Sequence, residues 1–306
     1  MPTQRRDFNF IQQKENLANP NKLSGFSTFF DRAWRQYFQQ LAKYSLFSFF
    51  VLLGIASSII YAYTAPSLKT GLELWALILG LAIFFVFFYS WGYAGMTLAA
   101  LYSEAPTIEI LEFSLAHLIS YIWIAILSAL IITVGYFLFI IPGIIFTSWF
   151  LFAVFIFFEN QTQTNAQSRI GGMAVLIKSR EYARGKVLSI FVLFFELVFI
   201  LSICYAVVNE VLALLAIPLL STLWTLLFSL FSSPFIIIYN QQIYRELKSK
   251  SKFAKNLSLT TAPGKFGIIP SKPNANLKFW LYFLAILGLL IYLALVWSFV
   301  GNLAVS

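Results

Sequence analysis

Apolar residues gather in six long blocks, and the short polar segments between the blocks carry nearly all of the charge. A membrane-spanning helix needs roughly 20 apolar residues, because each residue adds ~1.5 Å to a helix that must cross a hydrocarbon core of ~30 Å. Every block reaches that length, so the pattern predicts an all-α integral membrane protein. The blocks are Tyr44–Tyr63, Leu74–Tyr93, Leu118–Phe158, Val187–Val208, Val211–Tyr239 and Phe279–Val300.

The third block, Leu118–Phe158, has 41 residues, about twice the length that one span requires. It contains a Pro-Gly pair with no polar neighbour. A proline at the first position of a helix loses no hydrogen bond, whereas the residue before it, Ile141, is pushed towards an extended conformation. We therefore predict that Pro142 and Gly143 end one span and begin the next, which makes about seven transmembrane helices. One very long helix with a proline kink is the alternative.

The seven-span count separates the basic residues onto one side of the membrane. The segments 1–43, 94–117, 159–186 and 240–278 contain 7, 0, 5 and 8 Lys or Arg residues, which is 20 of the 21 in the chain, and only Lys69 falls on the other side. Cytoplasmic loops of membrane proteins carry an excess of Lys and Arg. The pattern thus predicts a cytoplasmic N-terminus and an external C-terminus.

Three segments that precede spans are amphipathic at helical spacing and are predicted to lie in the cytoplasmic membrane interface. They begin at Phe26, Pro106 and Gly171. In the first of them, the predicted apolar face consists of Phe26, Phe30, Ala33, Trp34, Tyr37, Phe38 and Leu41. Each segment precedes a pair of spans.

This spacing suggests four parts along the chain. A polar, basic tail of residues 1–25 leads into a six-helix membrane domain, 26–247, built from three units of an interfacial helix plus a helical hairpin. A basic linker, 248–276, contains several Pro and Gly residues and is predicted to be flexible. Residues 277–306 supply the seventh span and a short external tail.

Two stretches, FLFIIPGIIFTSWFLFAVFIFFEN and MAVLIKSREYARGK, resemble bacterial multi-pass proteins related to the membrane domain of glycerophosphodiester phosphodiesterases and their stand-alone inner-membrane relatives of unknown function. In that family a span ends in Pro-Gly, an aromatic span runs to a Glu, and a short helix with Ala, Ser and Gly precedes the next span. The residues that fit are Pro142, Gly143, Trp149, Glu159, Ala174, Ser179 and Gly185. Tyr182 and the polar insert Thr162–Ser168 depart from the pattern.

The resemblance covers about residues 26–247 and implies an architecture, in the cytoplasmic (inner) membrane of a prokaryote, far more than an activity. In the phosphodiesterases, catalysis belongs to a separate soluble barrel with histidines and metal-binding carboxylates. That barrel is absent from this sequence. The resemblance therefore implies no phosphodiesterase activity.

Candidate chemistry is sparse in a chain that is 60% hydrophobic and only 11% charged. With His117 and Cys204 as the only residues of their kinds, neither a His-rich metal cluster nor a disulfide can form, and no phosphate-binding loop occurs. We expect no catalytic site, metal or cofactor, with His117 at the interface and Cys204 as a small buried hydrophobic residue. The net charge of +9 follows from the one-sided loops, so nucleic-acid binding is not expected.

One carboxylate falls inside a predicted span. Glu196 is the tenth residue of Val187–Val208, so it is expected near the bilayer midplane, where an ionisable residue is a functional hypothesis by default. A protonated Glu that donates one interhelical hydrogen bond is the alternative. Hydroxyl residues recur at helical spacing in the next span, where Pro218 and Pro234 are expected to distort the helix. These hydroxyl residues are Ser221, Thr225 and Ser229.

A polybasic segment follows the sixth predicted span. Clustered lysines beside a membrane attract anionic lipid headgroups by ~1 kcal/mol per charge, although the same lysines can serve only to fix the topology. The lysines in question are Lys248, Lys250, Lys252 and Lys255. The sequence thus favours a non-enzymatic membrane protein that organises lipids or partner proteins. A small-solute or proton transporter that uses Glu196 is the alternative, and an intramembrane enzyme would need more facing polar groups than the spans contain.

Overall fold

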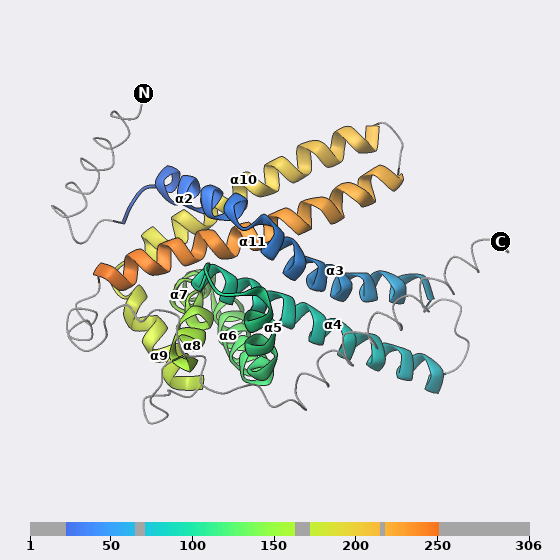
Figure 1. Ribbon diagram of the computed structural model, residues 1–306, viewed down its shortest axis with the longest axis horizontal. Coiled ribbons are helices and arrows are strands. Elements are labelled where there is room, and N and C mark those ends of the chain that lie inside the picture. Colours follow the sequence, from blue (N-terminus) through green and yellow to red (C-terminus); the bar gives the residue numbers. More distant parts are fainter. Residues whose placement is uncertain (1–22, 65–70, 163–171, 215–217, 251–306) are drawn as a thin grey trace.

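The computed structural model describes residues 23–64, 71–162, 172–214 and 218–250 (Figure 1). Every regular element in these ranges is a helix, so the predicted all-α class is confirmed. The helices are α2 (Phe26–Gln39), α3 (Leu41–Thr64), α4 (Gly71–Leu101), α5 (Thr107–Ala116), α6 (Leu118–Leu138), α7 (Ile140–Phe150), α8 (Ala153–Gln161), α9 (Gly172–Ala183), α10 (Val187–Leu214) and α11 (Pro218–Lys250). The predicted seventh span, Phe279–Val300, lies outside the described residues.

Five stretches of helix are long and apolar enough to cross a membrane, and a sixth is added if the bent pair α2 and α3 is counted as one span. The five are Ile78–Leu101, Leu118–Leu138, Ile140–Gln161, Val187–Leu212 and Leu223–Lys250. The chain is therefore a multi-pass helical protein with five or six candidate spans in its described part. Figure 1 shows α3–α4 and α10–α11 as two hairpins that meet near the middle of the molecule and diverge towards their loops.

The chain reverses direction inside the long third block, as predicted. The rings of Tyr121 and Phe158 stack with centroids 5.7 Å apart near one end of the hairpin. Near the other end, the Thr147 hydroxyl donates a hydrogen bond of 3.2 Å to the Tyr136 hydroxyl. These contacts join the start of α6 to the end of α8 and the end of α6 to the middle of α7, so the two spans are antiparallel.

The predicted place of this reversal is wrong by three residues. Phe139 is the extended residue, with φ −166° and ψ 156°, and α7 already begins at Ile140. Ile141 is helical, and Pro142 is the third residue of α7 rather than the first. The proline is tolerated there because N–H groups throughout the first turn of a helix lack an intrahelical acceptor.

Gly143 does not end a helix. Its missing side chain leaves room for a ring of the neighbouring helix. A Cβ atom at Gly143 would lie 2.3 Å from the ring of Tyr136, and one at Gly135 would lie 2.5 Å from the ring of Phe146. Both distances are far below van der Waals contact, so each ring occupies the space that a side chain would need. The close approach of α6 and α7 therefore requires glycine at both positions.

The boundary between the last two described spans also differs from the prediction. Asn209 and Glu210 were expected to separate the spans, but α10 continues through them to Leu214. Pro218 is the first residue of α11, where it distorts nothing, and Pro234 alone lies inside that helix. The helix accommodates Asn209 because its side chain accepts a hydrogen bond from Ser221 of α11.

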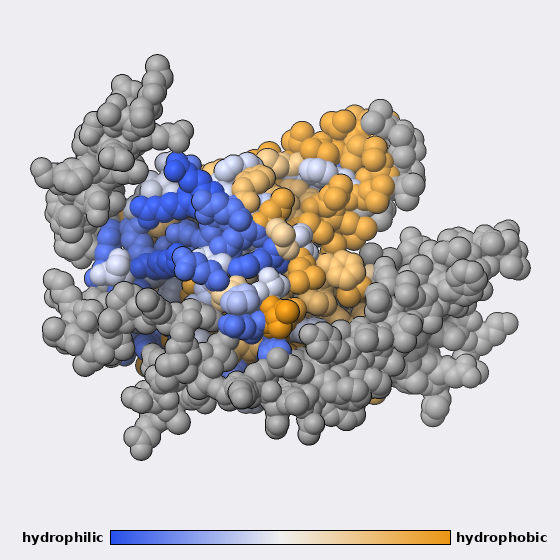
Figure 2. All heavy atoms as spheres, in the orientation of Figure 1, coloured by the Kyte–Doolittle hydropathy of each residue, from blue (hydrophilic) through white to orange (hydrophobic). Residues whose placement is uncertain are grey.

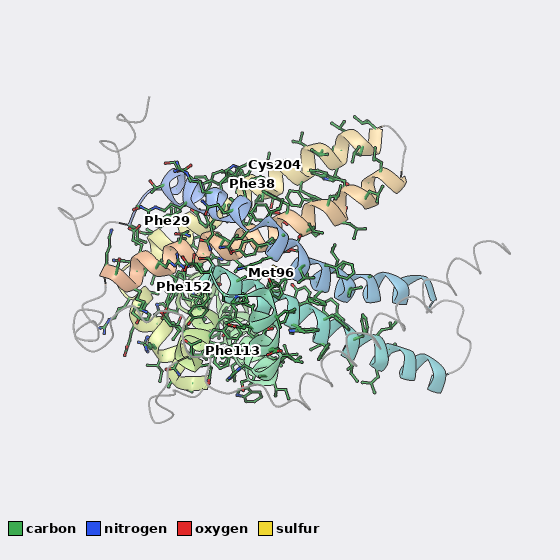
Figure 3. The ribbon with its side chains drawn as sticks, in the orientation of Figure 1. Phe29, Phe38, Met96, Phe113, Phe152 and Cys204 are labelled. Atoms are coloured by element: carbon green, nitrogen blue, oxygen red, sulfur yellow. The ribbon has the colours of Figure 1, made fainter. Side chains whose placement is uncertain are left out.

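Aromatic side chains dominate the core. Phe29 and Phe152 are fully buried, whereas Cys204 is exposed on α10 (Figure 3). The expectation that Cys204 would be buried is wrong, because α10 packs mainly against α11 and α7 and its opposite face is left uncovered. That face carries Phe195, Phe199 and other apolar side chains, as a surface in contact with lipid should.

The polar segments meet at one end of the molecule. The backbone N–H of Ser24 donates to Glu246, and Lys43 donates to the Ser103 carbonyl. Figure 2 shows hydrophilic residues gathered over this region and hydrophobic residues over the loop end of α10 and α11. We call this region the polar end. It comprises Ser24–Lys43, Leu101–His117, Glu159–Thr162, the helix α9 and Asn240–Lys250.

Candidate functional site

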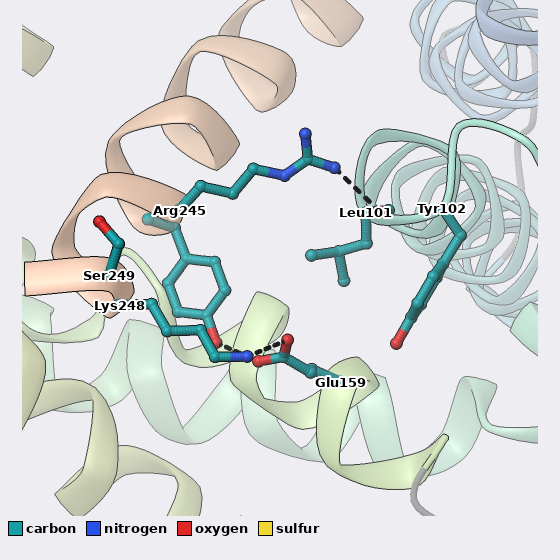
Figure 4. A pocket seen from close by; sticks show the side chains of 7 residues that line it. Leu101, Tyr102, Glu159, Arg245, Lys248 and Ser249 are labelled. Carbon is teal, nitrogen blue, oxygen red and sulfur yellow. Dashed lines mark hydrogen bonds and ion pairs between the residues drawn. The ribbon is translucent and has the colours of Figure 1, made fainter. Parts of the chain in front are cut away.

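A cavity of about 340 Å³ lies at the polar end, between the ends of α4, α8 and α11 (Figure 4). We call it the polar-end pocket. It is lined by Leu101, Tyr102, Glu159, Tyr244, Arg245, Lys248 and Ser249. The helix α11 supplies four of these residues within two turns, because positions three and four apart lie on the same side of a helix.

Glu159 is the centre of the hydrogen-bond network in the pocket. One carboxylate oxygen accepts a hydrogen bond of 2.6 Å from the hydroxyl of Tyr244, and the other accepts one of 2.5 Å from the ammonium of Lys248. The backbone carbonyl of Glu159 also accepts a bond of 2.8 Å from the Thr162 hydroxyl, which is paired in turn with the hydroxyl of Tyr102. This network connects α8 to both α4 and α11.

Arg245 closes the opposite side of the pocket. Its Nη2 donates to the carbonyl oxygens of Leu101 and Ala100, at 3.1 and 3.5 Å. These carbonyls belong to the last turn of α4, where backbone acceptors lack intrahelical partners and a cation is favoured by the helix dipole. Figure 4 shows the guanidinium turned towards Leu101 and away from Glu159.

A further cation lies beside the pocket on α9. Burial lowers the pKa of the Lys178 ammonium from its ordinary value of 10.5, the neighbouring Lys248 lowers it further, and Glu159 and Glu181 partly offset both effects. Three cations, Arg245, Lys248 and Lys178, thus lie in or beside the pocket, against the carboxylates of Glu159 and Glu181. Burial also raises the pKa of the Tyr102 hydroxyl to about 12, so that this residue stays neutral. The polar-end pocket therefore has an excess of positive charge.

A second carboxylate at the polar end, Glu246, was missed by the sequence analysis. Its side chain is only 9% exposed and accepts hydrogen bonds of 2.8 Å from the Ser24 backbone and from Lys250, while Arg32 lies 3.8 Å away. The signal was present, because Glu246 and Lys250 have the i,i+4 spacing of a helical ion pair. The carboxylate therefore links the residues just before α2 to the end of α11.

These contacts show that the described lysines of the polybasic segment are engaged within the protein. Lys248 pairs with Glu159 and Lys250 pairs with Glu246, so both have acidic partners within the chain. Lys250 is also largely buried, with 12% of its side chain exposed. Lys248 retains an exposed portion beside the pocket. Lys252 and Lys255 lie outside the described residues.

The residues that carry the family resemblance mainly join α7 to α9. The buried Ser179 hydroxyl donates a bond of 2.5 Å to the Trp149 carbonyl, and the Arg180 guanidinium lies 4.7 Å from the centre of the Trp149 ring. Ala174 is half-buried on α9, and Gly185, with φ +79°, follows the end of that helix in a conformation that favours glycine. Of this set, the structure brings only Glu159 into the polar-end pocket.

The hydroxyl residues of α11 pair with α10, but not with Glu196. Ser221 donates to the Asn209 side chain at 2.9 Å, and the hydroxyls of Thr225 and Tyr205 are 3.1 Å apart. Ser229 donates to the Thr225 carbonyl within its own helix. The hydroxyl stripe is therefore used in packing α10 against α11.

Glu196 lies elsewhere along the same helix pair. It precedes Tyr205 by nine residues, or ~13 Å of helix. Within the candidate span Val187–Leu212, Glu196 lies about 5 Å from the midpoint, on the side of the polar end, so it keeps a depth near the middle of the span. It is half-buried and has no hydrogen-bond partner among the described residues. The predicted intramembrane polar site is thus divided into two separate places.

Comparisons with protein-family models, curated proteins and solved structures give no match for this chain. The resemblance to the phosphodiesterase membrane domain stays a prediction. Within the described ranges, no three His, Cys, Asp or Glu side chains form a group that could hold a metal ion.

Proposed function

We propose that this chain is a non-enzymatic, multi-pass protein of a prokaryotic cytoplasmic membrane, and that it organises anionic lipids around its polar end. The observation that carries the proposal is the position of α2. This helix turns 89° away from the first part of α3 and lies across α11 (Figure 1). Phe29, which the sequence analysis left out of the apolar face, is fully buried against Tyr239 of α11.

The two edges of α2 face different parts of α11. On one edge, the Trp34 ring lies 6.1 Å from the rings of Phe231 and Phe235. On the other edge, the Arg32 guanidinium lies 3.8 Å from Glu246. Phe231 and Glu246 are 15 residues apart, or ~22 Å along the helix. The aromatic edge of α2 is thus directed towards the apolar part of α11 and the basic edge towards its polar terminus.

This arrangement supports a position of α2 in the membrane interface. Trp34 and Phe38 are 42% and 51% exposed, and the side chains of Arg32 and Arg35 are 47% and 60% exposed. Aromatic rings prefer the headgroup level, and neighbouring basic groups attract anionic lipid there. The one-sided distribution of Lys and Arg supports a cytoplasmic position for the polar end, with the N-terminus on that side and the C-terminus outside.

Lipid selectivity in reconstituted vesicles tests this function. Spin-labelled phosphatidylglycerol and phosphatidylcholine would be compared by electron paramagnetic resonance, as the fraction immobilised at the protein surface. We expect selectivity for the anionic lipid, and we expect Arg32→Gln to lower it by roughly five-fold, the value of ~1 kcal/mol per surface charge. Lys69→Gln, which removes the one basic residue predicted on the opposite side, is the matched control. Equal immobilisation of both lipids by the unaltered protein would refute the proposal.

A further inference from the structure

We infer that the polar-end pocket is a discrete site for one phosphate group, held between Arg245 and Lys248. The inference deepens the proposed function, and it rests on that function only for the source of the phosphate, which we take to be a lipid headgroup. The pocket lies at the same end of the molecule as α2, where lipid phosphates would be found.

Arg245 has N–H groups that are not engaged by the described residues. Its Nη2 is engaged with the carbonyls of Leu101 and Ala100, but its Nε and Nη1 have no hydrogen-bond partner among the described residues. A guanidinium that is held by one corner presents its remaining N–H groups in a fixed plane. That geometry matches two oxygens of a phosphate. The end of α4 thus orients Arg245 for a ligand.

Lys248 supplies a second cation on the same side of α11, one turn beyond Arg245. Its ammonium has three donors, of which Glu159 engages one at 2.5 Å. The lysine side chain remains 38% exposed. Glu159 therefore holds Lys248 in place beside the pocket and leaves donors for another acceptor.

Charge and size both favour an anion. Arg245, Lys248 and the neighbouring Lys178 outnumber the carboxylates of Glu159 and Glu181, of which only Glu159 lines the pocket, and a bound cation would be repelled by all three basic groups. A volume of about 340 Å³ is at the lower end of the range for small-molecule sites, which suits a phosphorylated headgroup and not a whole lipid. Leu101 gives one wall an apolar surface that a glycerol backbone can contact.

Binding to the full chain, purified in neutral detergent, tests the inference. Native mass spectrometry and calorimetry would be run with inorganic phosphate, short-chain phosphatidic acid and short-chain phosphatidylcholine. We expect one equivalent of phosphatidic acid to bind. Binding of inorganic phosphate with equal affinity would identify a soluble ligand and overturn the lipid source. If neither phosphate nor phosphatidic acid binds, or if phosphatidylcholine binds equally well, the site is refuted.

Three variants in the pocket and one control separate a ligand site from a structural cluster. Arg245→Gln and Lys248→Gln should each weaken phosphatidic acid binding about ten-fold or more, whereas Arg35→Gln, which removes an exposed charge on α2, should leave it unchanged. Glu159→Gln should strengthen binding by about five-fold, because it removes the opposing negative charge while its amide oxygen can still accept the hydrogen bond from Lys248. A loss of structure alone would weaken binding in every case, so weaker binding by Glu159→Gln contradicts the inference.

Failure of the pocket can be distinguished from failure of the proposed function. The pocket variants change the binding of one phosphate, and Arg32→Gln changes the selectivity of the surrounding lipid. If the unaltered protein selects anionic lipid but binds no single equivalent of phosphate, the proposed function stands and the pocket inference falls. If the protein binds one equivalent of phosphate but shows no selectivity for anionic lipid, the pocket inference stands and a lipid is not the source of the phosphate.

Discussion

The hydroxyl of Tyr244 donates a hydrogen bond of 2.6 Å to the carboxylate of Glu159, 85 residues earlier in the chain. Tyr244 is only 1% exposed, so this bond is made in the interior, where α8 meets α11. Removing the Tyr244 hydroxyl therefore tests how much this hydrogen bond stabilises the contact between α8 and α11.

Tyr244→Phe should lower the free energy of unfolding by about 1.5–3 kcal/mol, the usual value of a hydrogen bond to a charged group. The ring packing is kept, and Glu159 retains its bond to Lys248. Thermal unfolding in detergent would measure the change. Tyr182→Phe is the control, because Tyr182 is buried beside Tyr244 but has no hydrogen bond from its hydroxyl among the described residues. Equal shifts in both variants would argue against a role for the bond.

Glu246→Gln should be more harmful, because it removes the negative charge from a largely buried ion pair with Lys250. Breaking one side of a buried ion pair costs about 3–5 kcal/mol. Since Glu246 also accepts the Ser24 N–H, the start of α2 should become more sensitive to proteolysis. Asp31→Asn breaks an exposed ion pair on α2 and should cost about 0–1 kcal/mol. A Glu246 variant as stable as the Asp31 variant would contradict this expectation.

Gly143→Ala should destabilise the α6–α7 hairpin by about 1–3 kcal/mol, because the new methyl group overlaps the Tyr136 ring. Tyr136→Leu in the same chain should recover part of the loss by vacating that space. Gly80→Ala serves as the control, since no atom lies within 4 Å of its added Cβ. Unfolding temperatures of the four proteins would test the contact. The absence of any recovery by Tyr136→Leu would count against the overlap as the cause.

Phosphate binding should weaken as the pH rises, before an ordinary lysine would lose its charge. Burial and Lys248 lower the pKa of Lys178 below 10.5, so this cation is lost first, and the attraction for an anion falls with it. Tyr102 does not interfere, because burial raises its pKa to about 12. In Lys178→Arg the charge persists, and the decline should move to higher pH. Identical calorimetric pH profiles for the two proteins would exclude Lys178.

Residues 165 and 255 should be reached from the same compartment, the cytoplasm. Single cysteines introduced as Asn165→Cys and Lys255→Cys, in a chain with Cys204→Ser, would be labelled with an impermeant maleimide in cells and in inverted vesicles. The native cysteine is removed because it is exposed on α10. Labelling is expected only in inverted vesicles. Opposite results for the two positions would overturn the reversal of the chain between α6 and α7 as the basis of the topology.

Much of the fold follows from short-range patterns in the sequence. A lipid environment leaves few choices to an apolar segment of about 20 residues, because its backbone must satisfy its own hydrogen bonds as a helix. The helices, their antiparallel order and the gathering of basic segments were therefore predictable. The reversal itself was predicted near Pro142, but its location at Phe139 was not, since the first turn of α7 accepts the proline.

The candidate site could be predicted only in part. Glu159 was noticed through its motif and Lys248 through its basic neighbours, but nothing local indicated that the two would pair. Tyr244 has an ordinary sequence environment and gives no local signal. Arg245 begins the polybasic segment and Glu246 has the i,i+4 spacing to Lys250, but neither pattern predicts contacts with the end of α4 or with Ser24. Glu196 keeps its predicted depth near the middle of the span, but the hydroxyl residues expected beside it make their contacts elsewhere along α10 and α11.

The sequence is enough to predict which segments are helical, which are apolar enough for a membrane and which carry the basic charge, because these properties depend on neighbouring residues and on the solvent. Only the tertiary structure decided that Leu101, Glu159 and Arg245 surround one cavity. Their meeting depends on how the ends of α4, α8 and α11 pack together, which no local pattern specifies. Burial and pairing are properties of that packing, so a carboxylate acquires its partners only when the helices have met.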